Sequence, residues 1–441
     1  MFIGKKVIAK ILYIPLFMLL LYGCDQHPGK KVPDEAESTL DVHTVSVWAH
    51  AGQAAERRVL QSQVERFNRE SVNTQVKLTF IPERDYNAQV QAAAVAGDLP
   101  DLLEFDGPYL YNYVWQNKLV ALEALLPQSV RDDLLPSIVD QGTYNQHLYS
   151  VGVFDSGLGL YARKSALQEI RARIPSGADD AWNLHEFNEI LKKLALRDDD
   201  KAVLDLKLNY TGEWFTYGFS PVLQSAGADL INRDTYQTST GVLNSEAADS
   251  AMRQLQQWMQ QGLVDPNLDD AAFVAGRVAL SWSGHWEYAH YRNAWQDDVI
   301  ILPLPDFGKG SRTGQGSWSW GITRKSSDRS AAAGFIRFLL RTDEVLAMTN
   351  ANGAVPGTRS AVEQSRFYGA KGELRLFADQ LLQGVSVPRP KTPAYPVITT
   401  SFQQAFQEIR NGVTVKQALD KAATRIDQDI KDNQGYPFIS R

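Results

Sequence analysis

Two patterns of apolar and polar residues alternate along the chain from residue 43 onward. Apolar residues at every second position predict a strand, and apolar residues at steps of three and four predict an amphipathic helix. The first elements predicted in this way are strand 45–47, helix 54–69, strand 76–80, helix 85–96 and strand 102–105. Strands that alternate with helices predict an α/β fold with parallel strands.

The same two patterns continue through the rest of the chain. Further predicted elements are helix 245–261, strand 278–282, strand 299–304, helix 330–340 and helix 414–432. Gly97 is placed to end the helix that precedes it, because glycine commonly follows the last helical residue. The segment 309–316 is rich in glycine and basic residues, and we expect it to form a loop at the surface.

Residues 1–23 have the pattern of a secretory signal peptide. Three lysines within the first ten residues precede a 12-residue apolar stretch, and a small residue ends the segment. A membrane-spanning helix needs about 20 apolar residues, so this stretch is too short to be one. Residues 24–42 are polar and contain proline and glycine, which predicts a flexible tether. The sequence therefore predicts an extracytoplasmic protein.

Cys24 is the only cysteine of the chain. It follows Leu21-Tyr22-Gly23, which resembles the lipobox of bacterial lipoproteins, although Tyr22 stands where a small residue is usual and leaves the efficiency of processing open. The resemblance implies that Cys24 is lipidated and that its acyl chains hold the mature protein at the membrane. In such lipoproteins, an aspartate in the place of Asp25 implies retention at the inner membrane of a Gram-negative cell.

Length and charge narrow the class of protein. Cleavage before Cys24 leaves 418 residues, which exceeds a single hydrophobic core and suits two lobes of about 200 residues each. The net charge of −6 comes without a basic patch, so we expect no nucleic-acid partner. The 10 Trp, 17 Tyr and 18 Phe residues are a large aromatic supply, most of which we expect to pack in the core.

Sequence patterns for catalysis or metal binding are weak. None of the seven histidines lies three or four residues from another, the spacing that places two metal ligands on one helix face. There is no nucleophile turn and no phosphate loop, and residues 157–162 fit a dinucleotide fingerprint only inside a predicted strand. Glu104 and Asp106 share one face of a strand about 7 Å apart, but nothing marks either as the general acid of a glycosidase. We expect a protein that is not an enzyme and has no metal site or cofactor.

Several segments resemble one known family. Residues 93–119 contain Gly-Asp-Leu-Pro-Asp followed by an aromatic helix, as in the family 1 extracellular solute-binding proteins of ABC importers, the maltose-binding-protein-like sugar receptors. Other segments match motifs of this family in the same order: 149–164, 221–230, 273–286, 318–322, 353–360, 388–395 and 412–419. Each motif is short, but they follow the family's order, and the resemblance covers about residues 43–432.

The resemblance implies a periplasmic-binding-protein-like α/β fold with two discontinuous lobes. It places three hinge crossings near residues 153–156, 300–305 and 351–358. Lobe one would contain 43–154 and 301–353, and lobe two 155–300 and 354–441. The implied function is to bind a carbohydrate in the cleft between the lobes and to deliver it to the permease of an ABC importer. We expect a monomer.

Candidate ligand-binding residues follow from the chemistry of sugars, which present flat apolar C–H faces and a rim of hydroxyls. Aromatic rings suit the faces, and ionised groups make the stronger hydrogen bonds to the hydroxyls. Open α/β sheets bind ligands at the carboxyl ends of their strands. The candidates at strand ends, near crossings or on predicted walls are Trp48, His50, Tyr86, Asp106, Asp155, Trp214, Trp282, Trp286, Trp318, Trp320 and Arg359.

Each candidate has a structural alternative. A tryptophan at a strand end also caps a core, an acid there also caps a helix, and Arg359 also suits a structural ion pair. Trp318 and Trp320 are two residues apart on a predicted strand, so we expect both to line one wall. Gly284, between Trp282 and Trp286, is expected to allow a ligand to approach closely.

Two other functions remain open at this point. One is a receptor of the same fold for a polyamine, a metal chelate or a phosphorylated compound, although no cluster of Arg and Lys lies near the proposed walls. The other is a secreted lipoprotein enzyme that acts on polysaccharides. The sequence names neither the sugar nor the transporter.

Overall fold

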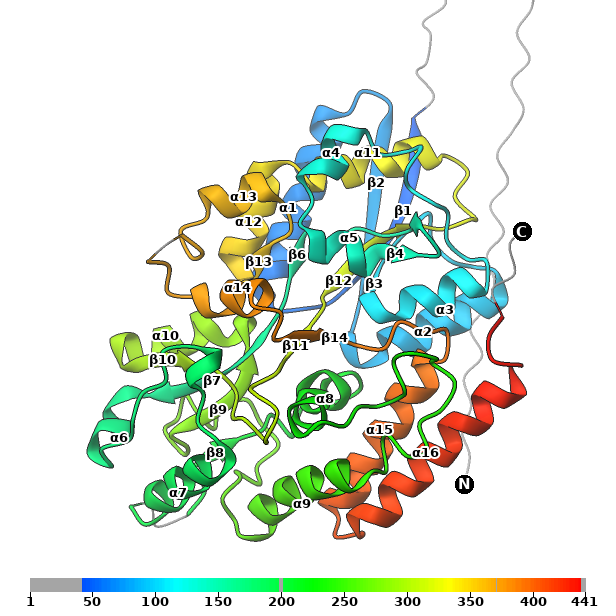
Figure 1. The fold of residues 1–441 in the computed structure, drawn as a ribbon. Coiled ribbons are helices and arrows are strands. Elements are labelled where there is room, and N and C mark those ends of the chain that lie inside the picture. Colours follow the sequence, from blue (N-terminus) through cyan, green and yellow to red (C-terminus); the bar gives the residue numbers. More distant parts are fainter. Residues whose placement is uncertain (1–41, 198–200, 370, 438–441) are drawn as a thin grey trace, which may run out of the picture. The chain divides into compact units, whose positions relative to one another are not determined.

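The computed structural model describes residues 42–197, 201–369 and 371–437. The predicted signal peptide, Cys24 and all of the predicted tether except Val42 lie outside these residues. Two four-stranded sheets organise the described chain, with strand orders β12-β3-β1-β2 and β10-β7-β9-β8 (Figure 1). The predicted α/β fold with two lobes is confirmed, with one sheet in each.

The first sheet combines three strands from the start of the described chain with one strand from much later in the sequence. Strand β3 pairs with β12 in antiparallel register, with Trp318 opposite Asp106, while β1 pairs in parallel with β2 and β3. The elements that belong with this sheet are β1 (His43–His50), α1 (Ala54–Glu70), β2 (Thr74–Ile81), α2 (Glu83–Ala96), β3 (Leu102–Asp106), α3 (Leu110–Trp115), α4 (Gln128–Asp133), α5 (Pro136–Gly142), β4 (Thr143–Tyr144), β5 (His147–Leu148), β12 (Trp318–Ile322), α11 (Arg329–Leu339) and α12 (Thr342–Asn352).

Local sequence explains the helix boundaries in this lobe. Gln53 and Glu56 form a reciprocal capping box at the start of α1, which buries Leu60 and Val64 against the sheet. Helix α2 ends at Gly97, whose φ of 73° is in the left-handed region that glycine adopts without strain. The predicted strands and helices between residues 45 and 105 are confirmed.

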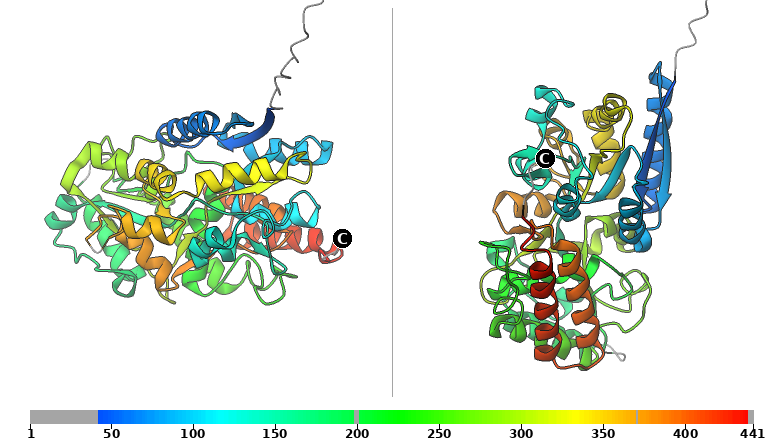
Figure 2. Two further views of the ribbon diagram at one scale, coloured as in Figure 1. Left: turned by 90° about the horizontal axis from the view of Figure 1, so that it is seen from above. Right: turned by 90° about the vertical axis from the view of Figure 1, so that its right-hand side faces the viewer.

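The second sheet contains β7 between β10 and β9, with β8 at the edge. The elements that belong with it are β7 (Leu158–Arg163), α6 (Lys164–Glu169), α7 (Leu184–Ala195), β8 (Leu204–Asp205), α8 (Trp214–Ala226), α9 (Glu246–Gln260), β9 (Leu280–Gly284), α10 (Tyr288–Trp295), β10 (Val299–Leu302), α14 (Arg375–Leu382), α15 (Tyr395–Arg410) and α16 (Val415–Asp432). Helices α15 and α16, at the end of the chain, lie side by side and pack on this lobe (Figure 2).

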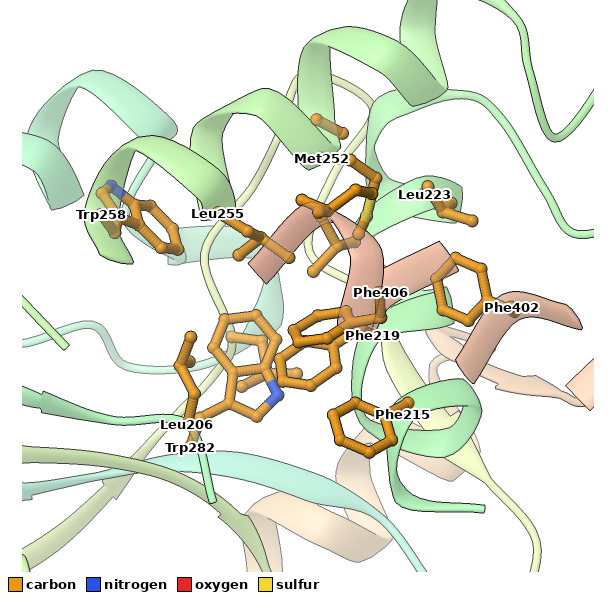
Figure 3. Close-up of a cluster of buried hydrophobic side chains, with 14 of the residues drawn as sticks. Leu206, Phe215, Phe219, Leu223, Met252, Leu255, Trp258, Trp282, Phe402 and Phe406 are labelled. Carbon is orange, nitrogen blue, oxygen red and sulfur yellow. The ribbon is translucent and has the colours of Figure 1, made fainter. Parts of the chain in front are cut away.

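The core of the second lobe is strongly aromatic. The rings of Phe219 and Phe406 stack with centroids 4.5 Å apart, and Trp282 packs against Phe219 from β9 (Figure 3). Trp258 from α9 belongs to the same cluster, so helices far apart in the sequence share one core. Burial of large aromatic side chains is the dominant favourable contribution to such a core.

Short strands connect the lobes. β6 (Phe154–Asp155) pairs with β13 (Val355–Pro356), and β11 (Thr313–Gln315) pairs with β14 (Ser386–Pro388), between the two sheets in Figure 1. After β13 the chain forms helix α13 (Arg359–Gln364).

The passage from lobe two back to lobe one differs from the expectation. Residues 299–302 pair with β7 of the second sheet, so the chain remains there beyond residue 301, where lobe one was expected to resume. It joins the first sheet only at Trp318. The segment 309–316 was expected to be a surface loop, but Thr313–Gln315 is a buried strand. Its basic and glycine residues therefore belong to the connection between the lobes.

Candidate ligand-binding site

Polar and aromatic side chains lie at or just after the ends of strands in both sheets. Parallel strands β1 and β3 end at His50 and Asp106, and antiparallel β12 begins at Trp318, opposite Asp106 on the same edge. In the second sheet, β9 ends at Gly284 and is followed by His285 and Trp286. This is the edge at which open α/β sheets bind ligands.

A buried arginine links the two lobes. Arg389 lies just after β14, and its Nη1 and Nη2 donate to the two carboxylate oxygens of Asp106 over 2.7 and 2.5 Å. Nη1 also donates to Oε2 of Glu213, 2.9 Å away, at the start of α8. Asp106 belongs to the first sheet and Glu213 to the second lobe. Arg389 is only 5% exposed, so its charged group joins both lobes away from solvent.

Aromatic residues enclose this charged group. The hydroxyl of Tyr109 donates to Oε1 of Glu213 over 3.1 Å, and that of Tyr395 donates to Oε2. The guanidinium of Arg389 lies 5.0 Å from the centroid of Tyr217, within the range of a cation–π contact. Among the described residues, Nε of Arg389 has no hydrogen-bond partner.

Burial and repulsion act together on Glu213. Burial raises the pKa of Glu213, the nearby carboxylate of Asp106 raises it further, and Arg389 opposes both effects. For Arg389, burial alone would lower the pKa, but Asp106 and the other neighbouring acids raise it. The arginine therefore stays charged between two acids that compete for it.

A second ion pair lies at the end of β1. Nδ1 of His50 donates to Oε2 of Glu104 over 2.8 Å, and the backbone N–H of His50 donates to the same oxygen over 3.1 Å. Burial would lower the pKa of His50, but Glu104 outweighs it and raises the pKa to about 9. The imidazolium stacks on the half-buried indole of Trp318, which also makes a perpendicular ring contact with Tyr86. The hydroxyl of Tyr86 donates to the backbone oxygen of Glu104.

The second lobe presents Trp286. Its half-buried ring contacts the edge of Trp214 with centroids 6.2 Å apart, and it also lies near Tyr217. A Cβ at Gly284 would come within 2.0 Å of the Trp286 ring. The missing side chain of Gly284 therefore makes room for this indole, and not for a ligand as the sequence suggested.

A hydrogen-bonded chain crosses the hinge next to Trp286. The hydroxyl of Tyr217 donates to Oγ of Ser156 over 3.0 Å, and Ser156 lies 2.9 Å from Nε2 of His285. Nδ1 of His285 lies 2.8 Å from the carbonyl of Asn352. Because a carbonyl only accepts, Nδ1 carries the hydrogen and Nε2 accepts from Ser156. Burial lowers the pKa of His285, which keeps the ring in this neutral form.

Asp155 serves the hinge itself. Its carboxylate accepts from the backbone of Ser156 over 2.8 Å, from Gln141 over 3.1 Å and from the backbone of Gly316 over 3.3 Å. Burial raises the pKa of Asp155 despite these donors. The contacts tie two of the connecting segments together, so this side chain already has partners within the protein.

Three of the predicted tryptophans lie in cores. Trp282 is 1% exposed and donates from Nε1 to the carbonyl of Gly218, and Trp214 donates to the carbonyl of Leu206. Trp320 is 2% exposed. It packs on Phe335, not beside Trp318 on a shared wall. These three side chains pack the cores and are not part of the proposed site.

The two remaining candidates, Trp48 and Arg359, lie in different parts of the structure. Trp48 is half-buried and packs with the cluster around Tyr86, close to His50 and Trp318. Arg359 is the first residue of α13, is exposed, and makes no hydrogen bond or ion pair with the described residues. The structure therefore groups Trp48, His50, Tyr86, Asp106 and Trp318 at one sheet edge and leaves Arg359 apart.

Sequence reasoning missed several residues of the site. They are Tyr109, Ser156, Glu213, Tyr217, His285, Arg389 and Tyr395. One signal was available, because Arg389 and Tyr395 lie in the segment 388–395 that was used only for the family resemblance.

A family model described as "Bacterial extracellular solute-binding protein" matches residues 62–375. The chain belongs to this family. A curated protein of Streptomyces antibioticus, named "Uncharacterized lipoprotein in oleD 5'region", is 22% identical over 443 residues and is matched over 94% of this chain and 91% of its own length. Members of the family bind solutes outside the cytoplasm.

Solved structures of sugar receptors share the fold. The GacH receptor of Streptomyces glaucescens, solved unliganded and with acarbose, has a TM-score of 0.74 and 19% identity, covering 89% of this chain and 98% of its own. A solute-binding protein of Thermotoga lettingae with α-D-tagatose has a TM-score of 0.75 and 19% identity, covering 88% and 99%. MalE of Bdellovibrio bacteriovorus with maltotriose has a TM-score of 0.74 and 20% identity, covering 88% and 100%. At this identity the likeness shows the two-lobed fold.

A membrane-spanning helix and a metal site are both absent from the part of the chain that the structure describes. No helix in it combines the length and the apolar character needed to cross a membrane. Its acids and histidines do not gather in groups of three or more that are arranged to hold a metal ion. A surface cavity of about 430 Å³ lies elsewhere, between the start of β1 and α11, lined by residues that include His43, Asp328 and Arg337.

Proposed function

We propose that this protein is the lipid-anchored, extracytoplasmic binding component of an ABC importer and that it holds a carbohydrate between its two lobes. The observation that carries the proposal is the meeting of aromatic rings and charged hydrogen-bonding groups from both lobes at the carboxyl ends of their strands. Asp106 and Trp318 come from the first sheet, Trp286 follows the second, and Arg389 joins the two.

The aromatic rings supply surfaces for sugar faces. Trp318 is half-buried and has His50 stacked on one side, so its opposite face is the one available for a sugar ring. Trp286 is held over Gly284 by Trp214 and is also half-buried. The two indoles come from different lobes, and each is fixed in orientation by its protein neighbours. Trp48, which is half-buried, extends the surface beside Trp318, whereas Tyr86 is fully buried and packs against Trp318 from within the cluster.

The charged groups supply partners for hydroxyls. The carboxylate of Asp106 accepts hydrogen bonds and the guanidinium of Arg389 donates them, and the free Nε–H of Arg389 is still without a partner. Hydrogen bonds to ionised groups are stronger than those between neutral groups. A ligand that contacts Asp106 and Trp286 at once binds the closed arrangement of the lobes better than an open one. That difference in affinity is what shifts the population toward closure.

Lipidation of Cys24 would keep this receptor at the membrane. The family of extracellular solute-binding proteins and the lipoprotein from Streptomyces antibioticus support this location. In a Gram-negative cell the protein would face the periplasm, and Asp25 would retain it at the inner membrane. Its partner is the permease of the importer, and we propose that it acts as a monomer.

The two alternative functions fit these contacts less well. A phosphorylated solute needs free cationic groups, but Arg389 is shared by Asp106 and Glu213. A glycosidase that used Glu104 and Asp106 would need one protonated and one free carboxylate. Each of these carboxylates is instead paired with a cation, Glu104 with His50 and Asp106 with Arg389. The proteins that this chain matches are binding proteins.

The experiment is a titration of the soluble part, from Asp25 onward, with a library of mono- and oligosaccharides, a polyamine and sugar-free phosphorylated compounds. Tryptophan fluorescence and the thermal midpoint are followed. A sugar at 100 times its dissociation constant stabilises the folded state by about 2.7 kcal/mol, so we expect a rise in the midpoint. A rise with an amine or a phosphate and with no sugar would show that the carbohydrate assignment is wrong.

A further inference from the structure

In the two ion-pair groups at the proposed site, three carboxylates face two cations. The two cations at the proposed site are His50 and Arg389, and both are already paired. His50 is bound by Glu104, whereas Arg389 is bound by two carboxylates, those of Asp106 and Glu213. Asp106 alone takes both Nη groups in a bidentate pair. Asp106 already neutralises the guanidinium, so Glu213 gives this group an excess negative charge.

The contacts of Glu213 suit a carboxylate. Tyr109 donates to one of its oxygens, and Tyr395 and Arg389 donate to the other. Hydrogen bonds from these three donors favour the ionised form of Glu213. Its position at the start of α8 holds the carboxylate beside Arg389. Burial and Asp106 raise the pKa of Glu213, as expected where two acids share one cation.

We propose that Glu213 makes the site select uncharged sugars and reject uronic acids and sugar phosphates. This inference rests on the proposed function and adds the substrate class to it. An acidic sugar would have to compete with Asp106 and Glu213 for Arg389, whose three side-chain hydrogen bonds all go to these two acids. It would also bring a like charge close to Glu213 in a buried region, where charges are poorly screened. An uncharged hydroxyl pays neither penalty.

The test compares matched probes on one protein. Glucose, galactose and their α1,4- and β1,4-linked disaccharides are titrated by calorimetry against counterparts with a C6 carboxylate or a C6 phosphate. For the wild-type protein, we expect the neutral member of a bound pair to have at least tenfold higher affinity than the acidic member. An acidic member that binds as tightly as its neutral counterpart would overturn the proposal.

The variant Glu213→Gln isolates the charge, because its amide oxygen still accepts from Tyr395 and Arg389. We expect the neutral-to-acidic affinity ratio to fall at least tenfold. Glu169→Gln is the matched control, since Glu169 is exposed on α6 and pairs with Arg197 over 2.9 Å. It changes the net charge of the protein equally and should leave the ratio unchanged. A ratio that stays the same in folded Glu213→Gln, or that falls equally in the control, contradicts the proposal.

A measurement on the wild-type protein covers the case in which Glu213→Gln does not fold. The ratio is followed from pH 7 to pH 5 with uronic acids, which stay ionised in this range. The other titratable groups that face Glu213 are Asp106, Arg389, Tyr109, Tyr113 and Tyr395. Because burial and Asp106 raise the pKa of Glu213, acidification brings its carboxyl toward the neutral form, and the neutral-to-acidic affinity ratio should narrow. A constant ratio overturns the proposal. If no probe of either kind binds, it is the proposed function that fails.

Discussion

The imidazole of His50 lies parallel to the indole of Trp318, with ring centroids 3.8 Å apart and an angle of 1° between the planes. Glu104 accepts a hydrogen bond from Nδ1 of this imidazole. The three side chains come from β1, β3 and β12, so the stack depends on the register of the whole first sheet. A charged ring against the indole fixes the orientation in which Trp318 can receive a sugar.

The ion pair between His50 and Glu104 predicts a pH dependence of stability. The pKa of His50 rises from 6.5 to about 9 on folding, so its contribution is fully present below pH 6.5 and is lost as the pH rises toward 9. The full size is about 3 kcal/mol, since one pKa unit corresponds to about 1.4 kcal/mol. Urea unfolding at pH 6, 7.5 and 9 measures it. The variant His50→Gln lacks the imidazole, so the fall in its free energy of unfolding between pH 6.5 and 9 should disappear. A pH profile identical to that of the wild type would refute the assignment.

Trp282 and Trp318 should respond differently to truncation. Trp282 lies in the aromatic core of the second lobe, so Trp282→Ala should lower the free energy of unfolding by about 3–5 kcal/mol. Trp318→Ala should cost less stability, because the ring is half-buried, but should weaken sugar binding at least tenfold. Denaturation and calorimetry on both variants give the comparison. Equal effects of Trp318→Ala and Trp282→Ala on affinity would argue against a sugar surface at Trp318.

Removal of the bridging arginine should affect both stability and binding. Arg389→Met leaves Asp106 and Glu213 buried without their cation, which typically costs about 3–5 kcal/mol. Arg389→Lys keeps the charge but loses the bidentate geometry, so it should recover most of the stability and little of the sugar affinity. Chemical unfolding and calorimetry measure the two effects. Wild-type affinity in Arg389→Lys would mean that the guanidinium does not contact the ligand.

The elements of the fold could be predicted from local patterns, but the path between the lobes could not. Residues 299–304 are apolar and end in prolines, a pattern typical of a strand that ends before a new segment. Whether that strand joins the first or the second sheet depends on its partner β7, about 140 residues earlier. Such long-range pairing leaves no trace in the periodicity of either strand.

Sequence can predict the candidate-site residues that are set by position along a strand, but not those whose partners lie far apart in the chain. His50 and Asp106 follow from the rule for strand ends. Trp318 and Trp320 are two residues apart on β12, yet Trp320 lies within the sheet against Phe335, while Trp318 lies at its open edge. Sequence also cannot rank Arg359 against Arg389, since Asp106, the partner of Arg389, is 283 residues away.

Membrane attachment should depend on one residue. Cys24 is the only cysteine, so Cys24→Ser removes the sole site for a lipid of this kind. We expect the full-length variant to move from the membrane fraction to the soluble extracytoplasmic fraction, because stable anchoring needs acyl chains. Immunoblotting of the fractions measures this, with Tyr22→Ala as the control that should be processed at least as well as the wild type. Retention of Cys24→Ser in the membrane would contradict the lipid anchor.

The most direct measurement is a crystal structure of the complex with the sugar that raises the thermal midpoint. We predict a sugar ring against Trp318 or Trp286 and hydroxyls within hydrogen-bond distance of Asp106 or Arg389, with residues of both lobes in contact. A sugar bound to one lobe alone, or in the surface cavity beside His43 and Asp328, would contradict the account.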